Sequence, residues 1–163
     1  MTMTEAVLVT THTIRPATAE DLDVLITMAE HFLADTVYHQ RTAVTLDSLR
    51  TSTMLLIDRG VVLMAFDAEQ RPIGILAGLA YDHYLANTRM ASESVWWVEP
   101  CARGSGVAQD LLSAFEAWAV DHGAMTVEIG SWHPRLDRFY ARLGYDPAER
   151  IFRKDVSHAQ SSH

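Results

Sequence analysis

Apolar positions recur with two different periods along the chain and predict a mixture of helices and strands. Helical spacing is found over residues 22–33, 111–119 and 136–143. Residues 61–66 form a short continuous apolar run, and residues 72–81 alternate between two faces, as strands do. The elements are therefore expected in the order β-α-α-β-β-β-α-β-α-β, which predicts a mixed α/β sheet with helices on both faces.

Capping signals place the ends of these elements. Thr18 is a predicted N-cap with Asp21 at the third helical position, a variant of the capping box, and Thr45 begins a second helix. Gly123 and Gly144 are expected to end the later helices. The remaining predictions are strands at Thr13–Ala17, Ser92–Val98, Met125–Ile129 and Arg150–Val156, and a loop at Asp82–Ala91.

The chain has the length and composition of one folded domain. It has 163 residues, of which 48% are hydrophobic and 21% charged. We find no internal repeat and no low-complexity linker. A single domain over residues 1–163 is expected, with an ordered core of about 12–156 and a polar tail at 157–163.

Charge and cysteine content exclude several kinds of partner. The 21 acidic and 13 basic residues give a formal net charge of −8, so a nucleic-acid partner is not expected. There is no signal-peptide pattern and no apolar run long enough for a membrane span, so a cytoplasmic protein without a membrane partner is expected. Cys101 is the single cysteine, and none of the eight histidines has metal-ligand spacing, so no metal is expected.

A glycine-containing turn after a predicted strand is the strongest chemical signal. Gly104 and Gly106 allow backbone amides to approach an anion, and the following helix begins with unpaired N–H groups. The helix dipole and the charge of Arg103 favour a diphosphate there. The loop has no lysine, as a P-loop needs, and no third glycine, as a Rossmann turn needs. A plain strand-to-helix turn remains the alternative reading of the loop alone.

Two motifs in this order resemble the GCN5-related N-acetyltransferases, the GNAT superfamily. Arg103-x-x-Gly106-x-Ala108 matches that family's Arg/Gln-x-x-Gly-x-Gly/Ala signature, and Phe139–Tyr145 is similar to its Phe-Tyr-x-x-x-Gly-Phe segment. The resemblance extends over about residues 14–156. Two further stretches resemble a bacterial and phage-type branch: Trp96–Pro100 and Phe115–Ala119.

The resemblance implies a GNAT-like fold and acetyl-CoA as co-substrate. The sheet is then mostly antiparallel, and its fourth and fifth strands splay apart. The pantetheine arm would pair with backbone around Trp96 and Val98, where a backbone N–H would polarise the thioester carbonyl. The backbone amides implied to hold the diphosphate belong to Arg103, Gly104, Ser105, Gly106, Val107 and Ala108.

The resemblance also implies catalytic residues. Tyr140 falls at the family's general-acid position, and a phenol with a pKa of about 10 can protonate a departing thiolate whose thiol has a pKa of about 8.5. A core-packing role for Tyr140 is the alternative. His133 stands where the family frequently has an asparagine, and as a donor it could replace that contact to CoA or substrate.

Glu93 is the first candidate for the base that deprotonates the incoming amine. Strand alternation predicts that Glu93 and Glu99 lie on the same side as Val95 and Trp97. A solvated strand-edge acid is an equal alternative for Glu93. Cys101 is interpreted as an inert loop thiol, because the family transfers the acetyl group directly within a ternary complex.

The function predicted from these residues is transfer of an acetyl group to a primary amine of a small molecule. The alternatives are a protein N-terminal or lysine acetyltransferase, a non-catalytic acyl-CoA-binding regulatory module and, more remotely, another nucleotide-phosphate binder. The acceptor side is expected from Phe32–Asp47 and Tyr81–Ala91. Homodimers are common among similar proteins, so a homodimer stays open as an alternative.

Overall fold

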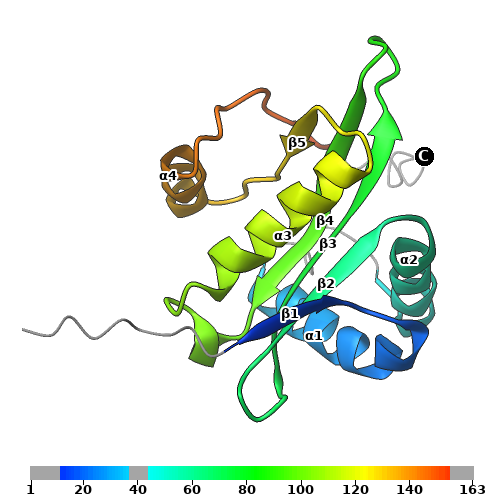
Figure 1. The fold of residues 1–163 in the computed structure, drawn as a ribbon, viewed down its shortest axis with the longest axis vertical. Coiled ribbons are helices and arrows are strands. Elements are labelled where there is room, and N and C mark those ends of the chain that lie inside the picture. Colours follow the sequence, from blue (N-terminus) through cyan, green and yellow to red (C-terminus); the bar gives the residue numbers. More distant parts are fainter. Residues whose placement is uncertain (1–11, 37–43, 155–163) are drawn as a thin grey trace, which may run out of the picture. The chain divides into compact units, whose positions relative to one another are not determined.

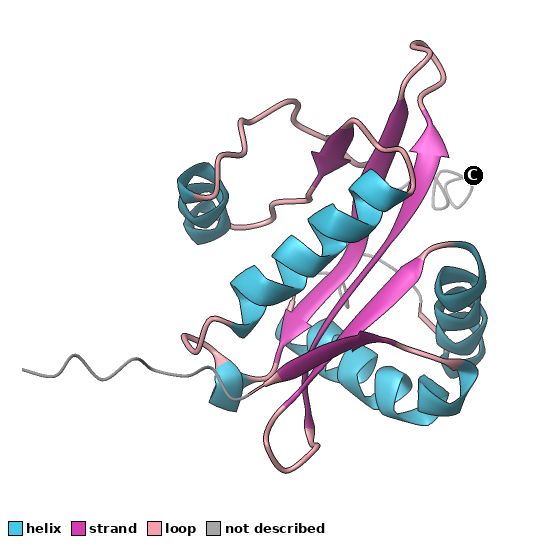
Figure 2. Cartoon of the chain, in the orientation of Figure 1, coloured by secondary structure: helices cyan, strands magenta, loops and turns pink. Residues whose placement is uncertain are grey.

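The computed structural model describes residues 12–36 and 44–154 and divides the chain into two compact units. Residues 1–130 form the first unit, and residues 131–163 form the second. The described residues of the first unit form a five-stranded sheet with the order β1-β2-β3-β4-β5 and three α-helices (Figures 1 and 2). The second unit contains the helix α4, Pro134–Arg142.

The sheet is mixed and mostly antiparallel, as predicted. Strands β1 to β4 pair antiparallel with their neighbours, and β5 joins β4 in parallel. Parallel pairing needs a crossover connection, and α3 provides it between β4 and β5. The strands are β1 Thr13–Pro16, β2 Val61–Phe66, β3 Pro72–Asp82, β4 Arg89–Val98 and β5 Thr126–Glu128.

Helices cover both faces of this sheet. The first helix, α1 (Leu22–Asp35), packs with α2 (Leu46–Arg59) on one face, and α3 (Val107–Asp121) packs on the other. Figure 1 shows α3 lying along the strands. None of the helices among the described residues combines the length and the apolar character that crossing a bilayer requires.

Alternate side chains of the strands pack on opposite faces of the sheet and form two apolar cores, one against α1 and one against α3. On the α1 face a cluster joins the helix to alternate strand residues; its members include Leu25, Met28, Phe32, Ile75, Ala77 and Trp97. On the α3 face, a Cβ added to Gly78 would meet the ring of Phe115, and one added to Gly74 would meet Leu111. Over residues 74–78 of β3, positions 75 and 77 therefore face α1, and positions 74, 76 and 78 face α3.

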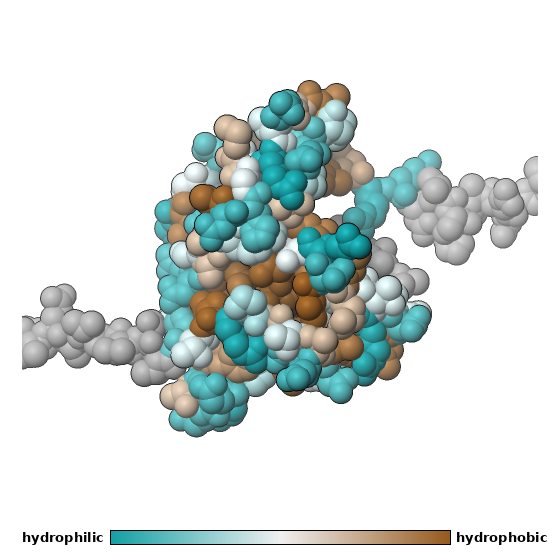
Figure 3. All heavy atoms as spheres, turned by 45° about the vertical axis from the view of Figure 1, so that its right-hand side comes forward, coloured by the Kyte–Doolittle hydropathy of each residue, from teal (hydrophilic) through white to brown (hydrophobic). Residues whose placement is uncertain are grey.

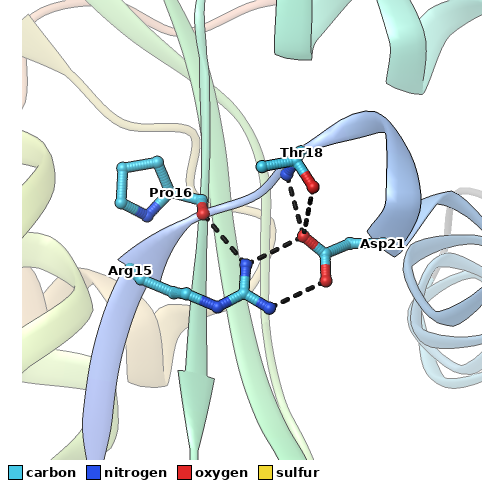
Figure 4. Close-up of polar contacts among 4 residues, drawn as sticks. All are labelled: Arg15, Pro16, Thr18 and Asp21. Atoms are coloured by element: carbon cyan, nitrogen blue, oxygen red, sulfur yellow. Dashed lines mark hydrogen bonds and ion pairs between the residues drawn. The ribbon is translucent and has the colours of Figure 1, made fainter.

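The 3₁₀ turn Ala19–Asp21, which leads directly into α1, contains the predicted capping box. Asp21 accepts hydrogen bonds from the Thr18 backbone N–H at 2.8 Å and from both terminal nitrogens of Arg15 at 2.8 Å (Figure 4). Hydrogen bonding to Arg15 holds the pKa of Asp21 well below its ordinary value. Arg15 also donates to the carbonyl oxygen of Pro16 at 3.1 Å, so this network ties β1 to the following turn.

Two predicted boundaries are wrong. The loop expected at Asp82–Ala91 is shorter, because β3 runs to Asp82, β4 begins at Arg89, and these two residues form an ion pair of 3.0 Å across the ladder. Residues 150–154 of the expected last strand are not in a strand, and 155–156 lie outside the described residues. Ile151 and Phe152 are 79% and 87% exposed, so the alternating pattern buries nothing there.

One face carries exposed apolar side chains. Figure 3, in which the side of Figure 1 that bears α2 comes forward, shows hydrophobic surface bordered by hydrophilic residues. No residue of α2 is fully buried, and Leu46 and Leu55 are 54% and 53% exposed. Helix α2 therefore contributes few side chains to the core, in contrast to α1.

Candidate active site

Strands β4 and β5 pair over only part of their length. The parallel ladder runs from Met90 opposite Thr126 to Ser92 opposite Glu128. Strand β4 then continues to Val98 along β3. The splay predicted between the fourth and fifth strands is therefore confirmed, and Trp96 and Val98 lie on β4 beyond the last β4–β5 pair.

A β-bulge at Ser94 reverses part of the predicted side-chain alternation. Ala77 pairs with Val95, whereas the next residue of β3, Gly78, pairs with Glu93, so Ser94 is the additional residue. Glu93 therefore shares the α3 face with Gly78, and Val95 lies on the α1 face. The expectation that Glu93 lies on the same side as Val95 and Trp97 is wrong.

Gly78 makes the bulge sterically possible. A Cβ at Gly78 would lie 2.4 Å from the Ser92 carbonyl oxygen, so a larger residue could not keep this close approach of β3 to β4. The prediction for Glu99 holds, because its carboxylate lies 2.8 Å from the His31 ring of α1. The error thus begins at the bulge and concerns Glu93 alone of the two acids.

Glu93 lies where the β4–β5 ladder ends. Its Oε2 accepts a hydrogen bond from the Gly130 backbone N–H at 3.2 Å. Burial raises the pKa of Glu93 to about 7, and the Gly130 hydrogen bond opposes this shift without cancelling it. A carboxyl group with a pKa near neutrality is suited to accept a proton and release it again.

The anion-binding loop predicted at residues 103–108, here called the cradle, lies at the start of α3. Gly104 and Gly106 adopt positive φ values of 83° and 92°, which favour glycine. A Cβ at Gly104 would meet no atom within 4 Å, so the backbone faces open space. Among the described residues no acceptor is recorded for the amides of Gly104, Gly106, Val107 and Ala108. These N–H groups and the helix dipole suit a diphosphate.

The side chain of Arg103 does not contribute to the cradle in the expected way. Its Nε donates to the Val98 carbonyl at 3.0 Å, and its Nη2 donates to Asp35 at 3.1 Å. The guanidinium also lies 4.6 Å from the ring centroid of Trp97. The charge of Arg103 is therefore paired with α1, and backbone groups dominate the cradle. Ser105 has a comparable local role, since its hydroxyl donates to the Ala102 carbonyl at 2.6 Å.

The second unit contains the two remaining predicted site residues. Tyr140 is 8% exposed on α4, with its ring near those of Phe139 and Tyr145 at centroid distances of 5.8 and 6.3 Å. His133 is the N-cap of α4, and its Nδ1 accepts the Arg135 backbone N–H at 3.1 Å. The Nδ1 atom of His133 therefore caps a helix, which leaves Nε2 as the ring atom that could donate.

Sequence reasoning missed several polar pairs around these elements. His12 lies 2.8 Å from Asp110 in the first turn of α3, and the Tyr81 hydroxyl donates to Glu128 at 3.0 Å. Members of these pairs are 98 and 47 residues apart in the sequence, and no local motif connects them. Cys101 is exposed in the 3₁₀ turn Pro100–Ala102 that precedes the cradle.

The arrangement of a splayed sheet, a bulge and a glycine cradle agrees with a family match. A model described as the acetyltransferase (GNAT) family matches residues 26–145. The chain belongs to this family of acetyltransferases. The match includes β4, the cradle and Tyr140, and the resemblance inferred from the two motifs is confirmed.

Solved structures of several acetyltransferases share this fold at low sequence identity. AAC(6')-Iy in complex with a CoA-containing bisubstrate analog is 16% identical with a TM-score of 0.73, covering 88% of this chain and 98% of that chain. The 6'-N-acetyltransferase AAC(6')-IG of Acinetobacter haemolyticus is 18% identical (TM-score 0.70; 88% and 99% covered). Glucosamine-6-phosphate N-acetyltransferase of Arabidopsis thaliana is 14% identical (TM-score 0.71; 90% and 99% covered). A search of curated proteins by sequence finds no match.

Proposed function

We propose that this GNAT acetyltransferase transfers the acetyl group of acetyl-CoA to a primary amine of a small molecule, by direct attack in a ternary complex. The observation that carries the proposal is the position of Glu93. Its carboxyl group lies at the end of the β4–β5 ladder, is held by the Gly130 amide and has a pKa of about 7. A base with this pKa at a strand opening is suited to deprotonating an amine.

The residues of the cradle fit the diphosphate of acetyl-CoA. The amides of Gly104, Gly106, Val107 and Ala108 would hold the phosphate oxygens, and the open space at Gly104 would admit them. The backbone of β4 around Trp96 and Val98 would hold the pantetheine arm beyond the last β4–β5 pair. A backbone N–H of this strand would polarise the thioester carbonyl.

Glu93 and Tyr140 would move the two protons of the reaction. The acceptor arrives as an ammonium ion, loses a proton to the Glu93 carboxylate and attacks the thioester carbon through its nitrogen. A C–N bond forms, the C–S bond breaks, and the electron pair leaves with sulfur. The nitrogen is cationic after the attack and loses its second proton to solvent, and Glu93 then releases its own proton to solvent, which gives the neutral amide. The Tyr140 hydroxyl would supply the proton that converts the thiolate to the thiol, and the phenolate is then reprotonated from solvent.

The acceptor is proposed to be a small cationic amine. One structural neighbour is named as an aminoglycoside 6'-N-acetyltransferase, and a second is in complex with a bisubstrate analog of CoA and acetylneamine. A third is named as a glucosamine-6-phosphate N-acetyltransferase. The formal net charge of −8 would favour approach of a cation over that of an anion. We propose small molecules ahead of protein amines on this basis.

The proposal is tested by measuring CoA-thiol release from acetyl-CoA across a panel of small amines and peptides. We expect acceptor-dependent release with small amines and a large decrease in Tyr140→Phe. Release with peptides alone would instead identify a protein acetyltransferase. Tight acetyl-CoA binding without release above the hydrolysis blank for any acceptor would favour a non-catalytic acyl-CoA-binding module.

A further inference from the structure

Arg103 is the centre of a set of contacts that joins the cradle loop to α1. Its guanidinium donates to the Val98 carbonyl at the end of β4 and to the Asp35 carboxylate in the last turn of α1. The same group stacks on Trp97 at 4.6 Å, and the Trp97 ring meets Phe32 of α1 edge-on at 6.4 Å. One side chain therefore contacts the strand that enters the loop and the helix beside it.

A second polar contact joins the same two elements. The His31 ring nitrogen Nδ1 lies 2.8 Å from Glu99 Oε1. His31 and Asp35 are one helical turn apart, so they lie on the same side of α1. Their partners are at either end of the 3₁₀ turn Pro100–Ala102. The residues that flank this turn, Glu99 and Arg103, therefore both contact side chains of α1.

We propose that Arg103 is a positioning residue, which acts with Asp35 to hold the cradle backbone in its anion-binding shape, and that it does not itself bind the diphosphate. This inference rests on the proposed binding of acetyl-CoA at the cradle. All three contacts of the guanidinium point to protein groups: a carbonyl oxygen, a carboxylate and an aromatic face. To bind a phosphate, Arg103 would have to leave the Asp35 carboxylate and uncover the Trp97 ring.

The charges predict opposite results for the two possible roles of Arg103. If it positions the loop, removing its partner in Asp35→Asn loosens the cradle and weakens CoA binding. If it binds phosphate directly, Asp35→Asn releases an arginine for the ligand and removes a nearby negative charge, so CoA binding is kept or strengthened. Asp35 and Arg103 have side chains 58% and 48% exposed, so both variants are expected to fold.

The experiment measures CoA binding by calorimetry for wild type, Asp35→Asn, Arg103→Gln, Arg103→Lys and the double variant Asp35→Asn/Arg103→Gln. We expect each single variant to bind about two- to fivefold more weakly, the range of one exposed ion pair. The double variant should bind no more weakly than Arg103→Gln. Arg103→Lys should not restore binding, because an ammonium group cannot make the fork and stacking contacts together.

Salt dependence and amide exchange give readouts that do not depend on turnover. Arg103→Gln should keep the wild-type dependence of the CoA dissociation constant on salt, because no phosphate contact is lost. Hydrogen exchange at the hydrogen-bonded amides of Ala102 and Ser105 in the free protein should be faster in both Asp35→Asn and Arg103→Gln. Glu30→Gln removes an exposed acid of α1 without a recorded partner on the loop and serves as the charge-matched control, with unchanged exchange and binding.

Three results would overturn the positioning role: unchanged or tighter CoA binding by Asp35→Asn, restoration of binding by Arg103→Lys, or additive losses in the double variant. CoA binding by the wild-type protein separates a failure of the proposed function from a failure of the positioning role. If wild-type protein does not bind CoA, the function is wrong. Exchange rates at the hydrogen-bonded amides of Ala102 and Ser105 still test whether Asp35 and Arg103 hold the loop.

Discussion

The Gly130 backbone N–H donates a hydrogen bond to Glu93 Oε2 over 3.2 Å, just beyond the last pair of β4 and β5. This bond favours the charged carboxylate, whereas burial favours the neutral acid. Burial has the larger effect and raises the pKa of Glu93 to about 7. At neutral pH the free protein therefore contains both protonation states of Glu93, and both activity and stability should depend on pH in this range.

Activity should rise with pH as Glu93 loses its proton. In the wild type, kcat/KM for the amine is expected to increase through a midpoint near pH 7 and then level off. Glu93→Gln should lack this increase and have a kcat/KM lower by about 10²- to 10⁴-fold, the usual contribution of a general base. The measurement is a pH–rate profile with acetyl-CoA at saturation.

A second acid near the same strands provides the control for this profile. Glu128 on β5 accepts a hydrogen bond from Tyr81 and is opposite Ser92, next to Glu93 in the sequence. Glu128→Gln should keep the increase near pH 7. If Glu93→Gln keeps it as well, the midpoint belongs to another group, such as the acceptor amine, and the proposed base is wrong.

Folding stability should show the cost of ionising Glu93. Its pKa is raised in the folded protein above the ordinary value of 4.5, so the folded state binds the proton more tightly than the unfolded state. The resulting stabilisation is complete below about pH 4.5 and is lost as pH rises through about 7. Glu93→Gln carries no charge and should be more stable than wild type by about 1–3 kcal/mol at pH 8.5.

Urea unfolding of both proteins between pH 4.5 and 8.5 measures this difference. The two stabilities should be similar at pH 4.5 and should diverge as pH increases. Glutamine can still accept the Gly130 hydrogen bond, so the substitution changes mainly the charge. A difference that stays constant with pH would show that the pKa of Glu93 is not raised in the folded protein.

Tyr140→Phe should lower turnover while leaving α4 intact. Phenylalanine keeps the ring contacts that Tyr140 makes with Phe139 and Tyr145, and only the hydroxyl is lost. If that hydroxyl protonates the departing thiolate, kcat should fall by about 10²- to 10³-fold with acetyl-CoA binding unchanged. Tyr145→Phe removes the other hydroxyl of this ring cluster and should retain activity. Equal activity of Tyr140→Phe and wild type would leave Tyr140 with a packing role alone.

The elements that the sequence predicted well depend on local pattern. The continuous apolar run from Val61 to Phe66 is β2 with those bounds, and Thr18 and Asp21 form the predicted capping interaction. Gly144 follows α4 with the expected positive φ. Period, capping residues and glycine conformations are all set by a few neighbouring residues, so one sequence is enough to locate them.

The bulge at Ser94 shows where local pattern is insufficient. Alternation along β4 predicted that Glu93 and Val95 share a face, but one additional residue between them reverses Glu93. The bulge depends on the close approach of Gly78 on β3 to the Ser92 carbonyl. That contact is between strands, and the residues of β4 alone do not indicate it.

Side-chain pairs between distant segments could not be predicted from the sequence either. Asp35 and Arg103 are 68 residues apart, and both side chains are common surface types, so neither position suggests the other. The cradle motif predicted that the charge of Arg103 would face an anion, whereas the fold offers it the Val98 carbonyl and Trp97 as closer partners. The backbone part of the cradle was predictable because it follows from two glycines and a helix start.

Two glycines with similar positive φ angles allow the cradle to be tested separately from stability. Gly104 has a φ of 83° and Gly144 a φ of 89°, and a Cβ at either would meet no atom within 4 Å. Alanine at each position should therefore cost a similar free energy of unfolding, about 1 kcal/mol, from backbone strain alone. Only Gly104→Ala places a methyl group in the space proposed for the diphosphate.

Acetyl-CoA binding should consequently weaken by about tenfold or more in Gly104→Ala, since a clash of 1.4 kcal/mol is enough for that factor. Gly144→Ala should bind as wild type does, measured by calorimetry beside thermal unfolding of both variants. If the two alanine variants lose stability equally but also bind equally well, the ligand does not approach the backbone at Gly104, and the cradle would have to be sought elsewhere. Because strain is matched, a difference in binding alone reports on the space in front of the Gly104 amide.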